Sequence, residues 1–397
     1  MEFIKGMDIS SLIEEEQCGA KYYMDGVQMD LLKILKIKGC NYCRLRLWNN
    51  PYDEEGTPYG AGSNDMAKLI ELSRRVKAEG MKILLDYHYS DFWADPGKQT
   101  IPKAWRGLDA EGLEKAVYEY TKATLIVLKE QNLAPDMVQV GNEITNGLLW
   151  PYGRKPEYDN IAKFVSAGIR AVREIVPAAK VMIHLDAGGN NPMYIDWFDN
   201  YTARGEDFDI IGMSYYPFWH GDLKALGSTL DKLAETQSDK QVQIVETAYY
   251  HQYFPNDATY NTTSVWPANA TGQYKFVSDL VSALADRSQV DGLYYWFPEE
   301  CGNGYQKEVL KGWVNRGLWD EVWQAKEHKP ITKTSGKDDG ALYILRDFAK
   351  GNGAQSLDPT LSDVQENSVK YNIAGQPISQ PTRGELYIQR GKKRIVR

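Results

Sequence analysis

Short apolar runs alternate along the chain with longer segments in which apolar residues recur every three or four positions. Runs of four to eight apolar residues are typical of buried strands, and the longer periodic segments are typical of amphipathic helices. Eight strands are predicted, near Ile4–Ile9, Tyr42–Leu47, Lys82–Asp86, Met137–Gly141, Lys180–Leu185, Ile210–Ser214, Gln243–Val245 and Leu293–Trp296. This alternation of strands and helices predicts an α/β fold with a parallel sheet.

The segments between the strands indicate how the sheet closes. Clear helices are predicted at Met66–Glu79 and Leu113–Gln131. Eight βα units favour a closed (β/α)8 TIM barrel, with an open doubly wound sheet as the alternative. Long connections rich in Gly, Pro and aromatic residues are typical of functional loops. They lie at His88–Trp105, Tyr249–Gln273 and Pro298–Trp319, so a barrel with long βα loops is predicted.

The end of the chain differs in composition from the barrel. A helix-like segment, Ala341–Ala349, is followed by sequence rich in Gly, Asn, Asp and Ser, and two short β-like stretches begin at Tyr371. We therefore predict two parts, a catalytic barrel over residues 1–350 and a C-terminal extension over 351–397. The last fifteen residues are basic, although the chain as a whole carries a net charge of -8.

Side chains that bind or react cluster where the predicted strands end. They are Arg46, Trp48, Asp86, His88, Asn142, Glu143, His184, Asp186, Tyr215, Glu246 and Trp296. In a (β/α)8 barrel the carboxyl ends of the strands form the active-site face. These positions are therefore the candidate site.

Glu143 and Glu246 are the candidate catalytic pair. Each follows an apolar strand directly, Glu143 after the fourth and Glu246 after the seventh, on opposite sides of the predicted barrel mouth. Hydrolysis of a glycosidic bond needs two carboxyl groups that flank the bond, about 5 to 5.5 Å apart for retention. Any single acidic residue is more often a solvated surface charge, so the argument rests on the pair. The amide of Asn142, beside Glu143, is suited to bind a sugar 2-hydroxyl.

Composition supports a carbohydrate ligand. The chain has 26 Tyr and 11 Trp against 5 His, and such aromatic side chains stack on sugar rings. Trp93 and Trp219, which lie in loops beside Asp, Ala or His, are predicted stacking platforms, although two or three of the tryptophans are expected in the core. His88 with Asp91, and His184 with Asp186, suit hydrogen bonds to sugar hydroxyls. A metal site is the alternative, but neither segment has the spacing of a strong metal motif.

Charge and cysteine content exclude other classes. Interspersed charges with a net charge of -8 argue against nucleic acids and polyanions as partners. No apolar run reaches the 18 residues of a membrane span, and the sequence shows no export signal. Cys40 and Cys43 lack the context of a zinc or redox motif and are expected to be buried thiols.

Several segments strongly resemble the arabinogalactan endo-β-1,4-galactanases of glycoside hydrolase family 53. They are Arg44–Trp48, Asp86–Gln99, Gly141–Ile144, His184–Asp186, Ser214–Gly221 and Val245–Tyr249, in the same order as in the family. The resemblance covers about residues 5–350. It implies a (β/α)8 barrel and a retaining mechanism in which Glu143 is the acid/base and Glu246 is the nucleophile. The implied substrate is β-1,4-galactan, the neutral side chain of pectin.

The resemblance also implies roles around the cleaved sugar for Arg46, His88, Tyr215 and Trp296. It implies no required cofactor. Relatives often hold the loops after strands seven and eight together with calcium or a disulfide, but Cys301 has no evident partner in Tyr249–Gln273. Asp257 alone makes a poor calcium site, so calcium is only a structural option. We expect a monomeric bacterial protein that is exported, its signal segment being absent from this chain.

Two alternatives remain open from the sequence. Another retaining barrel endo-glycanase, such as a mannanase or a xylanase, would share both glutamates but not the specificity. A carbohydrate-binding protein that has lost catalysis would keep the tryptophans and lose a carboxylate. Since Glu143 and Glu246 are both present, the sequence favours the enzyme.

Overall fold

The computed structural model describes most of the chain, and its residues form two compact units, Met1–Gly353 and Ala354–Arg397. The residues described are 2–301, 315–320, 327–332 and 340–343 in the first unit, and 370–372, 377–378, 386–389 and 392–395 in the second. The predicted helix Ala341–Ala349 and the predicted loop Pro298–Trp319 lie partly outside these residues.

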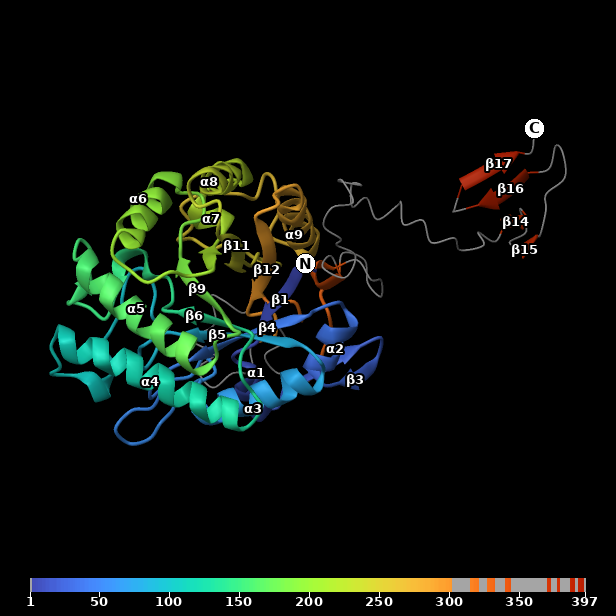
Figure 1. Ribbon diagram of the computed structural model, residues 1–397. Coiled ribbons are helices and arrows are strands. Elements are labelled where there is room, and N and C mark those ends of the chain that lie inside the picture. The colour runs from blue at the N-terminus through green and yellow to red at the C-terminus, as the bar shows by residue number, and fades with distance from the viewer. Residues whose placement is uncertain are drawn as a thin grey trace. The chain divides into compact units, whose positions relative to one another are not determined.

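Eight parallel strands close into a barrel in the first unit, which confirms the predicted (β/α)8 fold (Figure 1). The strands are β1 (Ile4–Asp8), β4 (Tyr42–Leu47), β5 (Lys82–Tyr87), β6 (Met137–Val140), β9 (Lys180–Leu185), β10 (Ile210–Ser214), β11 (Gln241–Glu246) and β12 (Val290–Trp296). Around the barrel each strand pairs with its neighbours in the chain, and β12 pairs with β1. The predicted strands near residues 243 and 293 were too short, because polar residues and Gly292 at the start of these strands interrupt the apolar run.

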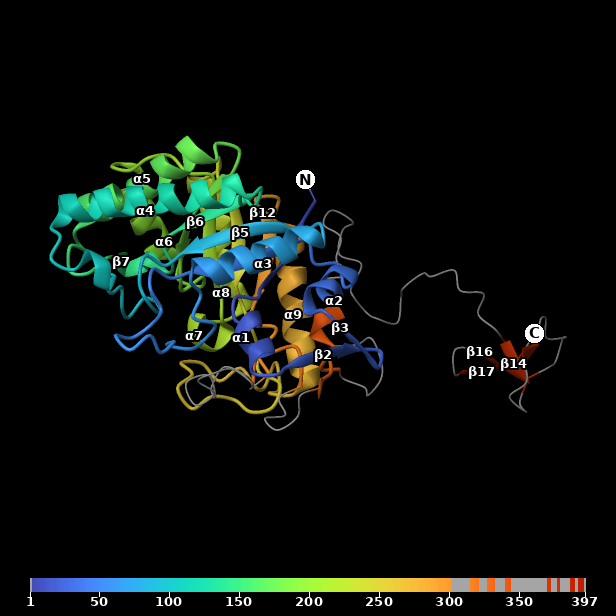
Figure 2. The same ribbon diagram turned by 90° about the horizontal axis from the view of Figure 1, so that it is seen from below.

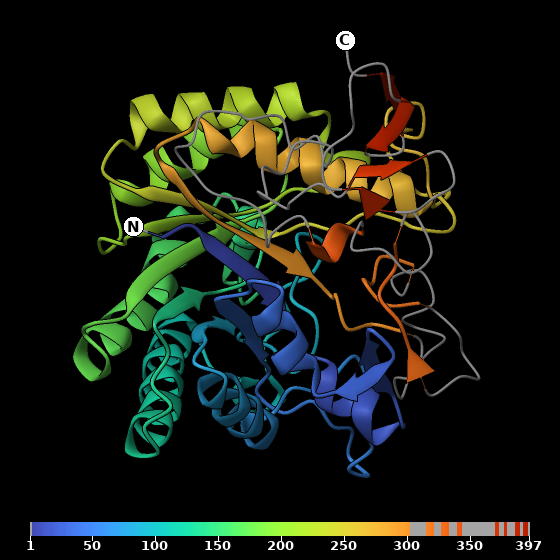
Figure 3. The same cartoon turned by 90° about the vertical axis from the view of Figure 1, so that its right-hand side faces the viewer.

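Helices surround the barrel on the outside, as the turned views show (Figures 2 and 3). They are α2 (Leu31–Ile37), α3 (Met66–Ala78), α4 (Ala110–Glu130), α5 (Tyr158–Ile175), α6 (Asn191–Thr202), α8 (Leu223–Thr236) and α9 (Ala270–Ala285). The short helices α1 (Leu12–Gln17) and α7 (Pro217–His220) follow the C-terminal ends of β1 and β10. The side chains of Asp65, Asp109 and Asp222 accept hydrogen bonds from the first turns of α3, α4 and α8. Asp109 thereby starts α4 three residues before the predicted Leu113.

The interior of the barrel begins with an apolar layer that takes one residue from each strand. This layer consists of Ile4, Tyr42, Leu84, Met137, Met182, Ile210, Val245 and Tyr294, all buried. A Cβ atom at Gly6 would overlap the ring of Tyr294, so only glycine leaves room on β1 for this ring. Since side chains alternate along a strand, residues two positions further along point to the same interior, above this layer.

Smaller sheets complete the two units. In the first unit β2 (Lys21–Met24) lies between β3 (Val27–Met29) and β13 (Glu327–His328), and β7 (Gly147–Leu148) pairs with β8 (Gly153–Arg154). In the second unit β14 (Lys370–Asn372), β15 (Pro377–Ile378), β16 (Leu386–Gln389) and β17 (Lys392–Ile395) form one antiparallel sheet. Within the described residues, every helix is too short or too polar to cross a membrane.

Candidate active site

A buried arginine holds the centre of the barrel together. Arg44, on β4, is 1% exposed, and its guanidinium pairs with Asp8 at 2.7 Å, with Asp86 at 2.9 Å and with Glu246 at 2.9 Å. It also donates to the side-chain oxygen of Asn142 at 2.8 Å. Because these partners come from β1, β5, β11 and the end of β6, one cation fixes four strand ends relative to one another.

Glu246 ends β11 and is buried, with 7% exposure. Besides its ion pair with Arg44, it accepts a hydrogen bond from the hydroxyl of Tyr216 at 3.2 Å. Burial raises the pKa of Glu246 to about 7, while Arg44 and the hydroxyl of Tyr216 oppose this rise by stabilising the carboxylate.

Glu143 follows β6 and adopts a left-handed backbone conformation, with φ of 47°. This conformation is strained for a residue with a side chain, and such strain is characteristic of functional sites. One carboxyl oxygen accepts a hydrogen bond from Ser214 at 2.7 Å. Loss of water contact, followed by the negative charges of Glu246 and Asp186, raises the pKa of Glu143 well above its ordinary value. Burial and these neighbouring charges therefore favour the protonated form of Glu143, whereas the ion pair with Arg44 favours the carboxylate form of Glu246.

A neutral histidine lies behind Glu143. Burial, followed by the charge of Arg44, lowers the pKa of His184 well below its ordinary value, so the ring is uncharged at neutral pH. Two N–H donors point at Nδ1 of His184, the side chain of Gln139 at 3.0 Å and the backbone of Glu143 at 3.3 Å. The side-chain oxygen of Asn142, also 3.0 Å from Nδ1, already accepts from Arg44 and Gln139, so this arrangement favours a ring proton on Nε2. Nε2 then donates to Ser214 Oγ at 2.9 Å, and Ser214 donates to Glu143. The chain of donors therefore ends on the carboxylate form of Glu143.

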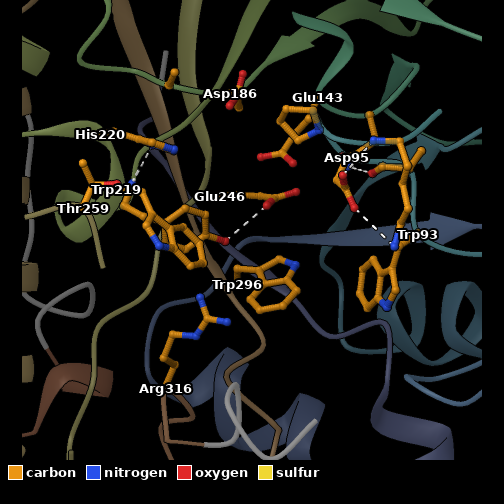
Figure 4. A pocket seen from close by; sticks show the side chains of 16 residues that line it. Trp93, Asp95, Glu143, Asp186, Trp219, His220, Glu246, Thr259, Trp296 and Arg316 are labelled. Carbon is orange, nitrogen blue, oxygen red and sulfur yellow. Dashed lines mark hydrogen bonds and ion pairs between the residues drawn. The ribbon is translucent and has the colours of Figure 1, made fainter. Parts of the chain in front are cut away.

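These groups face a cavity of about 490 Å³ (Figure 4). The predicted site residues that line it are Trp93, Asn142, Glu143, Asp186, Trp219, Glu246 and Trp296. Three tryptophans thus surround the carboxyl groups of Glu143 and Glu246, an arrangement suited to stack on sugar rings and to act on the bond between them.

Other predicted residues lie behind the lining. Arg46, 1% exposed, packs against the rings of Trp48 and Trp93, and Trp48 is fully buried. His88 is bonded to Asp86 at 3.1 Å and accepts from the backbone N–H of residue 94 at 3.1 Å. These contacts position the walls of the cavity. Direct contact of Arg46, Trp48 and His88 with a substrate stays a prediction.

Two further predicted residues lie away from the cavity. Tyr215 is buried, and its hydroxyl donates to the carbonyl oxygen of Gly221 at 2.8 Å. Asp91 lines a neighbouring cavity of about 400 Å³, which shares Trp93 and Lys98 with the first. The carboxylate of Asp91 accepts hydrogen bonds from the backbone, from residue 50 at 3.0 Å and from residue 103 at 2.7 Å.

Arg44, Ser214, Tyr216 and Arg316 are among the residues of the site that the sequence prediction missed. The alternation of side chains along a strand could have indicated three of them. Arg44 lies two positions beyond Tyr42, and Ser214 and Tyr216 lie four and six positions beyond Ile210. Tyr42 and Ile210 both belong to the apolar layer, so these three side chains are expected on the same interior face. Arg316 follows the eighth strand at a distance, and its place in the cavity comes only from the fold.

The described residues give no sign of a metal centre. Within this part of the chain, no group of three or more His, Cys, Asp or Glu residues is arranged to hold an ion. The thiols of Cys40 and Cys43 are free and buried, as expected.

A closed barrel with two carboxyl groups at the ends of its fourth and seventh strands is the arrangement expected of a glycoside hydrolase. The sequence pattern of glycosyl hydrolase family 53 matches residues 4–335. The chain belongs to this family.

Relatives of known name agree with this assignment. The endo-beta-1,4-galactanase of Bacillus subtilis is 38% identical over 350 residues, which are 86% of this chain and 80% of that protein. The arabinogalactan endo-beta-1,4-galactanase A of Emericella nidulans is 35% identical over 333 residues, which are 80% of this chain and 92% of that protein.

Solved structures give the same result. The Ignisphaera aggregans GH53 catalytic domain superposes with a TM-score of 0.77 at 36% identity, covering 87% of this chain and 96% of that one. Fungal β-1,4-galactanase superposes with a TM-score of 0.74 at 28% identity, over 87% of this chain and 99% of that one. A family 10 endo-β-1,4-xylanase, at 15% identity and a TM-score of 0.55, shares the fold alone.

Proposed function

We propose that the protein is a retaining endo-β-1,4-galactanase in which Glu143 is the general acid/base and Glu246 is the nucleophile. The observation that carries this proposal is the electrostatic difference between the two carboxyl groups. Arg44 and Tyr216 stabilise negative charge on Glu246 against the nearby carboxylates of Asp8 and Asp86, whereas burial and the carboxylates of Glu246 and Asp186 all disfavour charge on Glu143. A nucleophile must be ionised and a general acid must be protonated, which matches this difference.

In the first step of the proposed mechanism, the carboxylate of Glu246 attacks the anomeric carbon while Glu143 gives its proton to the glycosidic oxygen. The bond from the anomeric carbon to that oxygen breaks, and a covalent glycosyl ester forms on Glu246. In the second step Glu143, now a carboxylate, takes a proton from water. The water oxygen attacks the anomeric carbon and releases Glu246, so two inversions give net retention.

The change of role at Glu143 follows from the charge on Glu246. In the ester, Glu246 no longer carries a negative charge, so the repulsion that raises the pKa of Glu143 is weaker. The donor chain from His184 through Ser214 also stabilises the carboxylate of Glu143. Glu143 is therefore a better base in the intermediate than in the free enzyme.

The proposed substrate is β-1,4-galactan, as in the side chains of pectin. The two relatives described above are named endo-β-1,4-galactanases and match at least 80% of this chain. Trp93, Trp219 and Trp296 line the cavity and are the proposed platforms for neutral sugar rings.

Incubation with β-1,4-galactan, β-mannan and β-xylan tests this proposal. We expect hydrolysis of galactan with an early fall in viscosity, since internal cuts shorten the polymer quickly. Faster hydrolysis of mannan or xylan would instead support the alternative endo-glycanases, and release of monosaccharide alone would contradict internal cleavage.

We further propose that the enzyme acts as a monomer, outside the bacterial cell, and without a metal. The proposed reaction uses only the two glutamates, so dialysis against a chelator should leave kcat/KM on galactan unchanged. A loss that calcium restores would show that a structural ion is needed.

A further inference from the structure

Arg316 is a cationic side chain in the wall of the cavity that the proposed mechanism does not use. It is 1% exposed, and its guanidinium carbon lies 5.1 Å from the ring centre of Trp296 and 5.6 Å from those of Tyr216, Trp219 and Tyr250. Figure 4 shows the guanidinium pointing toward the space beside Trp296, with Glu246 between it and Asp186.

The guanidinium of Arg316 is not neutralised within the described part of the chain. Among these residues its Nε has no hydrogen-bond partner, and the carboxyl group of Glu246, which lines the same cavity, pairs with Arg44. By contrast, Arg44 is neutralised by Asp8, Asp86 and Glu246. A buried charge without a partner is costly, although contact with aromatic faces offsets part of this cost.

The location of Arg316 indicates which part of a substrate it meets. Glu143 protonates the oxygen of the leaving sugar, so the leaving part of the substrate lies toward Glu143. The part that stays bonded to Glu246 lies toward Trp296 and Arg316. This step rests on the proposed roles of the two glutamates.

We propose that Arg316 binds the carboxylate of an acidic sugar residue on the glycone side of the cleaved bond. A guanidinium presents its N–H groups as a planar fork, which matches both oxygens of a carboxylate. The aromatic rings hold this fork in place and exclude water, which strengthens the ion pair. A neutral donor such as an amide would suffice for a sugar hydroxyl, and it would avoid the cost of burying a charge.

The net charge of the protein does not oppose this specificity. A polyanion would meet the acidic surface of a chain with a net charge of -8. Carboxyl groups of Asp95, Glu143, Asp186 and Glu246 also line the cavity, so an isolated carboxylate in a mostly neutral galactan is favoured only at the position of Arg316. The predicted ligand is therefore a galactan that carries isolated uronic acid residues.

The test uses β-1,4-galactan in which some primary hydroxyls have been oxidised to carboxylates, with the untreated galactan as reference. In the products of the wild-type enzyme, mass spectrometry should find carboxylates enriched beside the sugar at the new reducing end. Depletion of carboxylates at that place, or a random distribution, would overturn the proposal without the use of any variant.

The ratio of kcat/KM on oxidised galactan to kcat/KM on neutral galactan tests the residue itself. In Arg316→Gln this ratio should fall roughly tenfold or more, the loss expected for a hydrogen bond between charged groups. The fall should lie mainly in KM and diminish at high salt. The control is Arg154→Gln, since Arg154 also stacks on a tryptophan, Trp150, at 4.4 Å, but lies outside the cavity lining. The control should keep the wild-type ratio.

An equal loss on both galactans in Arg316→Gln would show that Arg316 serves neutral sugars or the fold, which contradicts the proposal. If Arg316→Gln does not fold, Arg316→Lys keeps the charge and loses the fork, and its ratio should still fall. Failure of the wild-type enzyme to cleave neutral galactan would refute the proposed function instead, so the two failures are distinguishable.

Discussion

At the scale of single residues, the neighbours of Glu143 and Glu246 set their different properties. Both lie at the ends of barrel strands, and burial disfavours the charged form of each. Glu246 differs because Arg44 and Tyr216 stabilise its carboxylate. The alkaline limb of kcat/KM should therefore report loss of the proton from Glu143, and the acidic limb should report protonation of Glu246.

Replacing Asp186 by Asn should move the alkaline limb to lower pH. The negative charge of Asp186 raises the pKa of Glu143, so its removal lowers this pKa, and Glu143 loses its proton earlier as the pH rises. The pH dependence of kcat/KM on galactan measures the shift. A limb that stays in place or moves to higher pH would show that Asp186 does not act on Glu143 through its charge.

Replacing Ser214 by Ala should shift the same limb in the opposite direction. The hydroxyl donates to Glu143 and stabilises its carboxylate, so its loss raises the pKa of Glu143. Deglycosylation should also become slower, because Glu143 must act as a base in that step. Asp186→Asn and Ser214→Ala serve as controls for each other, because their alkaline limbs should shift in opposite directions. Shifts in the same direction would contradict this account.

The sequence predicted the catalytic pair because each glutamate ends an apolar strand. Tyr215 was predicted because it follows the end of a strand. The alternation of side chains that starts at Ile210 instead places Tyr216 on the interior face. Alternation alone would not have found Glu246, because Val245 already faces the apolar layer. The register between β10 and β11 shifts at Met213/Ser214, and this irregularity is not visible in the sequence.

At the scale of elements, the strands of the barrel are joined by polar contacts as well as by backbone hydrogen bonds. Arg44 on β4 pairs with Asp8 on β1, Asp86 on β5 and Glu246 on β11. The strands and helices were predictable from local periodicity. The contacts of Arg44 and Arg316 were not, because they join segments that are distant in the sequence.

Replacing Arg44 by Met should destabilise the protein by about 3 to 5 kcal/mol, because it leaves buried carboxylates without their partner. Urea unfolding measures this loss. The control is Arg75→Met, which removes half-buried ion pairs to Glu16 and Asp30 and should cost no more than about 1 kcal/mol. Equal effects of the two changes would show that the central cation is not important for stability.

At the scale of the whole molecule, all the residues of the proposed mechanism belong to the unit Met1–Gly353. A chain that ends at Gly353 should therefore keep kcat/KM on galactan within about a factor of two of the full chain. Circular dichroism serves as the control for folding. A large loss of activity in a folded, shortened protein would show that residues 354–397 contribute to catalysis.

The central claim, that Glu246 is the nucleophile and Glu143 the acid/base, is tested most directly by azide rescue of the two alanine variants on an aryl β-galactoside with a good leaving group. In Glu143→Ala the intermediate still forms on Glu246, and azide needs no general base, so the account predicts β-galactosyl azide. In Glu246→Ala azide replaces the missing nucleophile, and the predicted product is α-galactosyl azide. The anomers found the other way round would contradict the assignment.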